Sequence, residues 1–326
     1  MKAAVYSRYG PPEVVHIADI EKPVPKDDEV LIKIRAASVN PLDWRLMRGA
    51  PYLLRALPGL RKPKIKRPGR DVAGQVEAVG RNVTEFKPGD GVFGACRGAF
   101  AEYACAPESA LVSKPPNVTF EQAASVPVAG LTALQGLRDK GHIQPGQAVL
   151  INGAAGGVGT FAVQLAKSFG AEVTGVCSTR NADMVRSIGA DHVIDYTQKD
   201  FTKMGQRYDL LFECVGNCSL SACRRVLNSN GICVIAGAPR ELWPFVGRAL
   251  GAPVLSRCVS QKFVTFMARV RKEDLAVLGE LMAAGKLTPV IDRRYSLSEV
   301  PEAIRYLEKG HARGKVVITL GEESEN

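Results

Sequence analysis

The chain has 326 residues, of which 46% are hydrophobic, and a formal net charge of +10. This length is sufficient for two hydrophobic cores, and the composition excludes a disordered, a collagen-like and a disulfide-stapled protein. No stretch approaches 18 apolar residues and the first residues show no secretory pattern, so we expect a cytoplasmic protein without a transmembrane segment. The eight cysteines form no C-x-x-C pair, and we expect them to be reduced thiols.

The positive charge favours an anionic partner, and the charge alone leaves nucleic acid, an anionic membrane surface and a phosphorylated cofactor open. The densest basic run, residues 55–70, contains three prolines, which exclude a recognition helix. No aromatic residue lies between its basic residues, as the binding of single-stranded nucleic acid would require. We therefore interpret this run as a solvated loop and expect no nucleic-acid partner.

Two patterns divide the sequence into domains. Short β-rich runs separated by proline- and glycine-containing turns predict an irregular β-rich domain over residues 1–120. Over residues 121–258, apolar strands alternate with amphipathic helices, starting with a helix over residues 121–137, and this alternation predicts a doubly wound parallel sheet. Residues 259–326 contain two further helices and a closing strand, which we expect to return to the first domain. The predicted fold class is α/β.

A glycine cluster lies between a predicted strand and a predicted helix in LINGAAGGVGTFAVQLA, residues 150–166. It nearly matches the dinucleotide fingerprint G-x-G-x-x-G, although Ala154 replaces the first glycine. In this context the loop backbone approaches a pyrophosphate closely, and the helix N-terminus faces the anion. A purely structural turn is the alternative. The predicted cofactor-binding residues of the loop are Ala155, Gly156, Gly157, Val158 and Gly159.

The end of the next predicted strand, VCSTRN, bears on the choice of cofactor. It carries no carboxylate of the kind that binds the ribose 2′-hydroxyl in NAD sites. Ser178, Thr179 and Arg180 instead offer two hydroxyls and a guanidinium, which suit the 2′-phosphate of NADPH. We therefore predict NADPH as the cofactor; an ordinary surface position is the alternative for Arg180.

Six motifs follow one another along nearly the whole chain: SVNPLDW (38–44), RPGRDVAGQVEAVG (67–80), KPGD (87–90), AAGGVG (154–159), IGADHVIDY (188–196) and GHARGKVVI (310–318). Together they resemble the medium-chain dehydrogenase/reductase superfamily, in particular its zinc-free quinone oxidoreductase branch of zeta-crystallin-like and chloroplast-envelope homologues. The resemblance implies a GroES-like catalytic domain around an inserted Rossmann domain. It also implies a homodimer and hydride transfer from NADPH to quinones or α,β-unsaturated carbonyls. Ala154 matches this branch.

The zinc alcohol dehydrogenases of this superfamily hold their catalytic metal with Cys, His and Cys. The corresponding positions here are Asn40, Arg70 and Val128, none of which supplies a thiolate or an imidazole. We therefore predict no metal site. A zinc alcohol dehydrogenase, and a nucleotide-binding protein of the same fold with little turnover, are the alternative functions.

The resemblance also implies roles for residues outside the glycine loop. Asn40 lies beside the nicotinamide, where it positions the ring or binds the substrate carbonyl, or it only forms a turn before Pro41. Arg70 faces the cleft or pairs with Asp71 to brace its loop. Thr132 lies near the cofactor or bonds its own helix. The implied catalytic residues are Asn40, Asp43, Arg70 and Thr132, and the implied additional cofactor-binding residues are Tyr196, Val215, Gly237, His311, Ala312, Arg313 and Lys315.

The structural role of two segments can be interpreted in more than one way. Residues 310–315 close over the cofactor and neutralise its phosphates, or they form a solvated basic turn. Residues 240–270 contain four aromatic residues that line an apolar substrate mouth or, more simply, pack in a core or an interface. Peripheral membrane contact is a third possibility for this segment. Its aromatic residues are Trp243, Phe245, Phe263 and Phe266.

Overall fold

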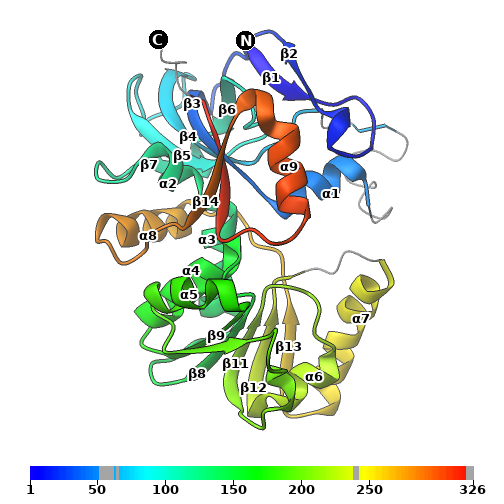
Figure 1. Ribbon diagram of the computed structural model, residues 1–326. Helices are drawn as coiled ribbons and strands as arrows, with labels where there is room; N and C mark the ends of the chain where they lie inside the picture. Colours follow the sequence, from blue (N-terminus) through cyan, green and yellow to red (C-terminus); the bar gives the residue numbers. More distant parts are fainter. Residues whose placement is uncertain (51–61, 64–65, 238–241, 321–326) are drawn as a thin grey trace. The chain divides into compact units, whose positions relative to one another are not determined.

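The computed structural model describes residues 1–50, 62–63, 66–237 and 242–320 (Figure 1). Most of the basic run predicted as a solvated loop therefore lies outside the described residues. The chain forms two compact units. The first unit consists of Met1–Ala129 and Val270–Asn326, and the second unit is Gly130–Arg269.

The second unit contains a six-stranded sheet in the order β10-β9-β8-β11-β12-β13, and all neighbouring strands are parallel. Its central strands β8 and β11 have an apolar middle because helices cover both faces; Val149, Leu150 and Ile151 are fully buried. The predicted doubly wound parallel sheet is confirmed. Its strands are β8 (Ala148–Asn152), β9 (Glu172–Cys177), β10 (His192–Asp195), β11 (Tyr208–Glu213), β12 (Leu227–Ile235) and β13 (Lys262–Thr265).

The strand order reverses between β8 and β11, which defines the ligand-binding edge of the sheet. From β8 the chain proceeds to β9 and β10 on one side, and from β11 it proceeds to β12 and β13 on the other. Right-handed crossovers in opposite directions place α4 and α5 on one face and α6 and α7 on the other (Figure 1). Ligands of such sheets bind at the carboxyl ends of the strands beside the reversal. The helices are α4 (Gly157–Ser168), α5 (Ala182–Ser187), α6 (Leu220–Arg225) and α7 (Leu242–Cys258).

The single helix predicted over residues 121–137 is wrong. The structure has α2 (Phe120–Ala124), α3 (Pro127–Gln135) and a π-helical turn over Gly136–Lys140. Pro127 has no N–H to continue the hydrogen bonds of α2, and it disfavours a helical conformation in the residue before it, so one helix ends and another begins. The compact units divide within α3 and beyond β13, whereas the sequence places these boundaries after residues 120 and 258.

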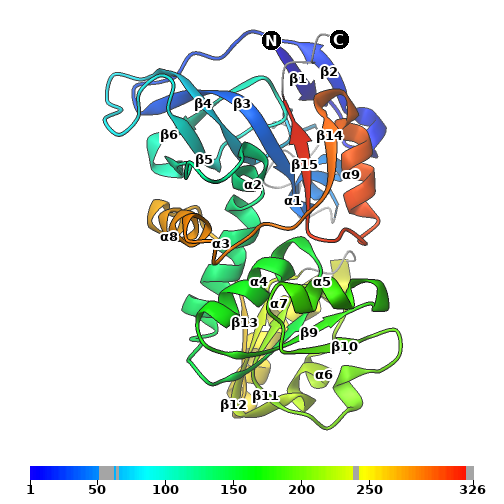
Figure 2. The same cartoon turned by 60° about the vertical axis from the view of Figure 1, so that its left-hand side comes forward.

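The first unit is built on a seven-stranded sheet in the order β14-β15-β3-β4-β5-β7, with β6 pairing to β3 outside this path. Strand β15, near the end of the chain, pairs antiparallel with β3, and Figure 2 shows β14 and β15 beside each other. Strands β1 (Lys2–Val5) and β2 (His16–Asp19) form a separate pair. The sheet strands are β3 (Glu29–Val39), β4 (Asp71–Val79), β5 (Gly91–Ala95), β6 (Tyr103–Pro107), β7 (Leu111–Ser113), β14 (Ile291–Ser296) and β15 (Lys315–Thr319).

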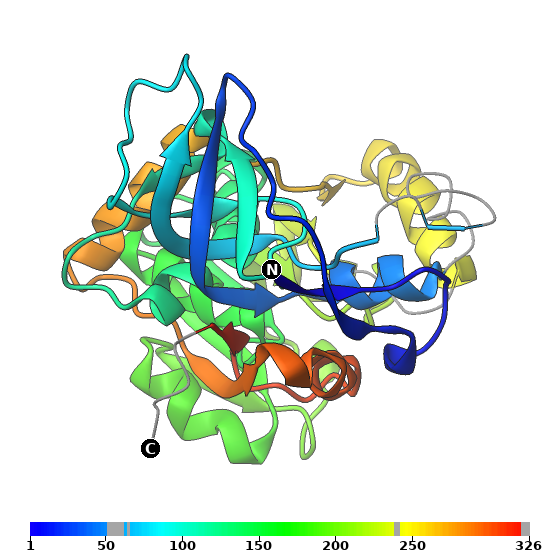
Figure 3. The ribbon, with the colours of Figure 1, turned by 90° about the horizontal axis from the view of Figure 1, so that it is seen from above.

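Three further helices pack on this sheet and on its loops. Helix α1 (Pro41–Arg48) lies beside α9 (Val300–Glu308), as Figure 3 shows from above, and α8 (Lys272–Ala283) packs on β7. The core of the unit joins β3, β4, α1, α9 and β15, so segments from both ends of the chain share it. Among the described helices, none combines the length and apolarity needed to cross a bilayer.

Candidate active site

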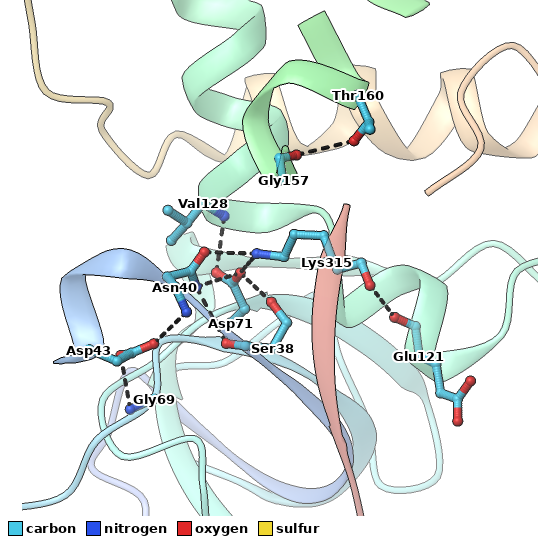
Figure 4. Close-up of polar contacts among 11 residues, drawn as sticks. Ser38, Asn40, Asp43, Gly69, Asp71, Glu121, Val128, Gly157, Thr160 and Lys315 are labelled. Carbon is cyan, nitrogen blue, oxygen red and sulfur yellow. Dashed lines mark hydrogen bonds and ion pairs between the residues drawn. The ribbon is translucent and has the colours of Figure 1, made fainter. Parts of the chain in front are cut away.

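A buried polar network joins β3, β4, β15 and the start of α1 in the first unit (Figure 4). Asp71 Oδ2 accepts hydrogen bonds from Ser38 Oγ at 2.7 Å and from Asn40 Nδ2 at 2.9 Å. Lys315 Nζ donates to Asn40 Oδ1 at 2.7 Å and lies 3.3 Å from Asp71 Oδ2. All four side chains are buried, so the carboxylate and the ammonium compensate each other in a site that water does not reach.

Strand register brings these residues together. Ser38 of β3 is the partner of Asp71 in β4, and Val39 is the partner of Val316 in β15. Asn40 and Lys315 each lie one position beyond that second pair, which places them side by side although 275 positions separate them in the sequence. The sheet therefore builds the network.

The carboxamide of Asn40 is almost completely occupied by this network. Its Nδ2 donates to Asp71 and to the carbonyl of Ser38 at 3.3 Å, and its Oδ1 accepts from Lys315. An amide has two N–H donors and two acceptor positions, and the second acceptor position faces the backbone N–H of Asp43 in the capping box of α1. Asn40 also stands directly before α1 as its N-cap, which agrees with the turn-forming interpretation, and its place beside the nicotinamide stays a prediction.

Asp43, in the first turn of α1, is buried behind Asn40. Its Oδ2 accepts from Asn40 N at 2.7 Å and its Oδ1 accepts from Gly69 N at 3.2 Å. Burial raises the pKa of Asp43 from 3.8 to about 7; the two backbone donors oppose this shift and the charge of Asp71 adds to it. Asp43 therefore changes its charge near neutral pH.

The structure gives Asp71 and Lys315 other contacts than the sequence predicts. Asp71 pairs with Lys315 in the structure, in place of the Arg70–Asp71 brace, and its Oδ1 also accepts from Val128 N at 3.0 Å. The ammonium of Lys315, which the sequence assigns to cofactor phosphates, already has two partners inside the first unit. A phosphate contact of Lys315 stays a prediction.

In the second unit, the glycine loop follows β8 and leads into α4. Gly156 is extended (φ −84°, ψ 174°), and α4 begins at Gly157. The first-turn N–H groups of a helix have no carbonyl partner within it, so they are available to an anion. A Cβ on Gly159 would lie only 2.0 Å from the carbonyl oxygen of Gly153, so this position requires glycine. The loop therefore fits a pyrophosphate.

The alanine in the fingerprint has a packing explanation. Ala154 is fully buried, and its N–H donates to Val176 O in β9 at 3.0 Å. Its methyl carbon lies 3.0 Å from the place that a Cβ on Gly175 would take. The missing side chain of Gly175 thus leaves the room that the methyl group of Ala154 fills.

The predicted 2′-phosphate residues lie at the carboxyl ends of β9 and β10, together with a carboxylate that the sequence-based prediction missed. The hydroxyl of Thr179 donates to Asp195 Oδ2, and Thr197 Oγ1 donates to Asp195 Oδ1 at 2.7 Å. These hydroxyl hydrogen bonds lower the pKa of Asp195, so it is ionised at neutral pH. Register could have revealed it, because Asp195 is the partner of Cys177, which directly precedes the VCSTRN hydroxyls.

Other predicted cofactor residues lie in nearby loops of the same unit. Val215 follows β11 and Gly237 follows β12, so both lie at the carboxyl edge that carries the glycine loop. A Cβ on Gly237 would lie 2.4 Å from the backbone of Cys214, which explains the glycine. Glu213, a second missed residue, is buried and accepts from Val215 N at 2.9 Å. Tyr196, after β10, has 55% of its surface exposed.

The remaining assignments stay predictions. Thr132 lies in α3, within the second unit, and His311, Ala312 and Arg313 lie between α9 and β15 in the first unit. The backbone N–H of Arg313 donates to Asp292 Oδ2 at 2.8 Å, which fixes this loop. The backbone that carries the Arg313 side chain is therefore fixed.

Of the four aromatic residues proposed for a substrate mouth, Phe263 is buried in the core of the second unit. This supports the packing interpretation for Phe263, whereas the side chains of Trp243 and Phe245 lie outside the described residues. Phe266 is half-buried and approaches the backbone of Gly136 closely. None of these placements bears on membrane contact.

Comparison with known proteins identifies the class to which this fold and site belong. The family described as alcohol dehydrogenase GroES-like domain matches residues 26–116, and the family described as zinc-binding dehydrogenase matches residues 188–318. The chain is 37% identical to the chloroplastic quinone-oxidoreductase QR1 of Triphysaria versicolor, over 98% of both chains. It is 34% identical to the chloroplastic NADPH-dependent alkenal/one oxidoreductase of Arabidopsis thaliana, over 98% of this chain and 79% of that protein.

A solved structure agrees with these relatives. The quinone oxidoreductase of Escherichia coli, complexed with NADPH, superposes with a TM-score of 0.83 at 25% identity, covering 98% of this chain and 100% of that one. The protein belongs to the medium-chain dehydrogenase/reductase superfamily and, within it, to the quinone oxidoreductase branch. The predicted family and the predicted pair of GroES-like and Rossmann domains are confirmed.

Proposed function

We propose that the protein is an NADPH-dependent reductase of quinones or α,β-unsaturated carbonyls that works without zinc. Relatives over the full length of the chain are named for quinone and alkenal/one reduction. The observation that carries the proposal is the fit of the loop between β8 and α4 to a dinucleotide, with Gly159 held where any side chain would collide.

This chain's own residues supply binding, orientation and a fixed electrostatic environment. Backbone N–H groups at Gly157 and Val158 hold the pyrophosphate, and Ser178 and Arg180 hold the 2′-phosphate. When bound, NADPH supplies the hydride that reduces a quinone or the β-carbon of an enone. Asn40, held by Asp71 and Lys315, would lie beside the nicotinamide and position its ring.

Zinc independence is supported by the donor set at the three metal-ligand positions. The carboxamide of Asn40 is committed to Asp71 and Lys315, and the Val128 side chain has no ligand atom. The described residues hold no group of three or more His, Cys, Asp or Glu side chains arranged for a metal. Without a Lewis acid, acceptors that are already electrophilic are the suitable substrates.

The decisive experiment is a panel of quinones and enones assayed with NADPH and with NADH, beside metal analysis of the purified protein. We expect oxidation of NADPH with several acceptors and less than 0.1 zinc per chain, about the level of contamination. Tight NADPH binding without turnover on any acceptor would favour the nucleotide-binding alternative. One zinc per chain, lost together with activity on chelation, would overturn zinc independence.

We also propose a cytoplasmic homodimer. The eight cysteines are free thiols in the structure, which supports a reducing compartment, and the dimer rests on the resemblance to the family. Light scattering at micromolar concentration and fractionation of the source cells test the two statements. A monomer, or a membrane-bound fraction, would contradict them.

A further inference from the structure

Three arginines of the first unit line one small pocket. Arg67, Arg70 and Arg97 surround a pocket of about 20 Å³, which we call the arginine pocket. In the part of the chain that the structure describes, none of their guanidinium groups has a hydrogen bond or an ion pair. Arg48 and Arg81 of the same unit, by contrast, pair with carboxylates. Three unpaired guanidinium groups at one pocket favour an anion.

The backbone that carries these arginines is fixed by hydrogen bonds. Gly98 N donates to Gly69 O at 3.0 Å, and Cys96 N donates to Arg70 O at 2.8 Å. The Nε atom of Arg67 lies 3.3 Å from the place of a Cβ on Gly98, so this side chain lies across the glycine. A fixed backbone beneath the three arginines reduces the part of the ordering cost of anion binding that comes from the main chain.

Tyr6 adds a hydrogen-bond donor to the wall of the arginine pocket. It lines the arginine pocket, and only 2% of its surface is exposed. Within the described residues its hydroxyl has no hydrogen-bond partner, so the O–H group is available to a molecule in the pocket. Burial raises the pKa of Tyr6 to about 12, so the phenol keeps its proton and can donate it to an acceptor in the pocket.

A larger pocket of about 430 Å³ is also lined by Tyr6 and Arg67, so these two residues border both pockets. Val5 and Ile20 contribute apolar surface to it, and Lys66 adds a further positive charge. This volume accommodates an apolar chain of drug-like size. The two pockets together match a molecule with an apolar body and an anionic end.

The arginine pocket adjoins the candidate catalytic residue. Asp43 lines it and accepts a hydrogen bond from Asn40 N at 2.7 Å. We propose that Arg67, Arg70 and Arg97 bind a carboxylate or phosphate group at the end of the substrate, so that the enzyme prefers anionic enones or quinones with an apolar chain. This inference rests on the proposed function and names its substrate class.

The test uses one medium-chain enone in three forms: a terminal carboxylate, its methyl ester and a terminal phosphate monoester. We expect kcat/KM for the carboxylate or the phosphate to exceed that of the ester about tenfold at low salt, with the difference shrinking as salt rises. The more reactive of the two anions identifies the natural group. Arg67→Gln and Arg97→Gln should each lower the anion-to-ester ratio about fivefold, with ester turnover within twofold of wild type.

Arg81→Gln is the matched control, because it removes an arginine of the same unit that pairs with Asp27 outside both pockets. Its anion-to-ester ratio should equal that of the wild type. Equal rates for anion and ester in the wild type would overturn the inference, as would a loss of both activities in parallel in the variants. A rise in KM for NADPH alone would assign the arginines to the cofactor. No turnover of any form would instead reject the proposed function.

Discussion

Lys315 carries its charge in the interior of the first unit, with 2% of the side chain exposed. The resemblance to the family implies a phosphate contact for Lys315, and a solvated basic turn is the alternative. The structure instead places the ammonium between Asn40 and Asp71. A buried ammonium is tolerated only beside a compensating carboxylate, so the lysine holds the orientation of Asn40.

Replacing Lys315 by methionine should therefore be costly. Lys315→Met leaves the buried carboxylate of Asp71 without compensation, and we expect the free energy of unfolding to fall by about 3–5 kcal/mol. Urea denaturation measures this loss. Lys309→Met, at an exposed position near the end of α9, should change stability by less than about 0.5 kcal/mol. Equal effects of the two substitutions would show that the buried pair has no structural role.

Asp43 should make stability depend on pH. Its pKa is about 7 in the folded chain and 3.8 in the unfolded chain, so the folded chain binds the proton more tightly between these values. Its contribution to the free energy of unfolding is therefore largest near pH 4 and is lost as the pH rises to about 7. Urea denaturation at several pH values should show that Asp43→Asn removes this part of the slope. Asp28→Asn, at an exposed position, should retain it, and identical slopes in all three proteins would contradict the assignment.

At the scale of elements, the ends of β9 and β10 show which site residues can be predicted from a local sequence pattern and which cannot. The hydroxyls and the guanidinium of the residues after β9 can be predicted as phosphate ligands from that segment alone. Asp195 ends the neighbouring strand, and only the register of β10 against β9 brings it to Thr179. A negative charge thus lies beside the hydroxyls proposed for a phosphate dianion.

Asp195 should weaken the preference for NADPH over NADH. Asp195→Asn removes the charge and releases the hydroxyl of Thr179, so the ratio of kcat/KM for NADPH to that for NADH should rise about fivefold. Binding of 2′,5′-ADP relative to 5′-AMP should rise by a similar factor. Asp200→Asn is the control, because Asp200 caps Thr202 much as Asp195 caps Thr197. An unchanged ratio in Asp195→Asn would show that Asp195 only stabilises its turn and does not affect the choice of cofactor.

The elements themselves were predictable to different degrees. Alternation of apolar strands and amphipathic helices identified β8, α4 and β9, because the buried parallel sheet imposes its pattern on each segment. The break between α2 and α3 was missed, although Pro127 marked it, because the apolar pattern continues through it. Strand β13 was missed because its four residues are too short to carry a period.

At the scale of the whole molecule, the first unit combines both ends of the chain. β15 pairs with β3, and α9 packs on α1, so residues after Val270 complete a core begun before residue 50. The arginine pocket likewise combines Tyr6, which follows β1, with the segments around Arg70 and Arg97. Sites of this kind depend on tertiary folding, and no single segment contains them.

The sequence by itself determined the family, the α/β class and the phosphate-binding loop, because each of these depends on a local pattern or on ordered motifs. Gly159 is needed by a contact within its own loop, so the motif alone revealed it. The tertiary structure decided what Asn40, Asp71 and Lys315 do, because their contacts depend on strand register across hundreds of residues. It also decided which charges are paired, and it left Arg67 and Arg97 without an ion pair among the described residues.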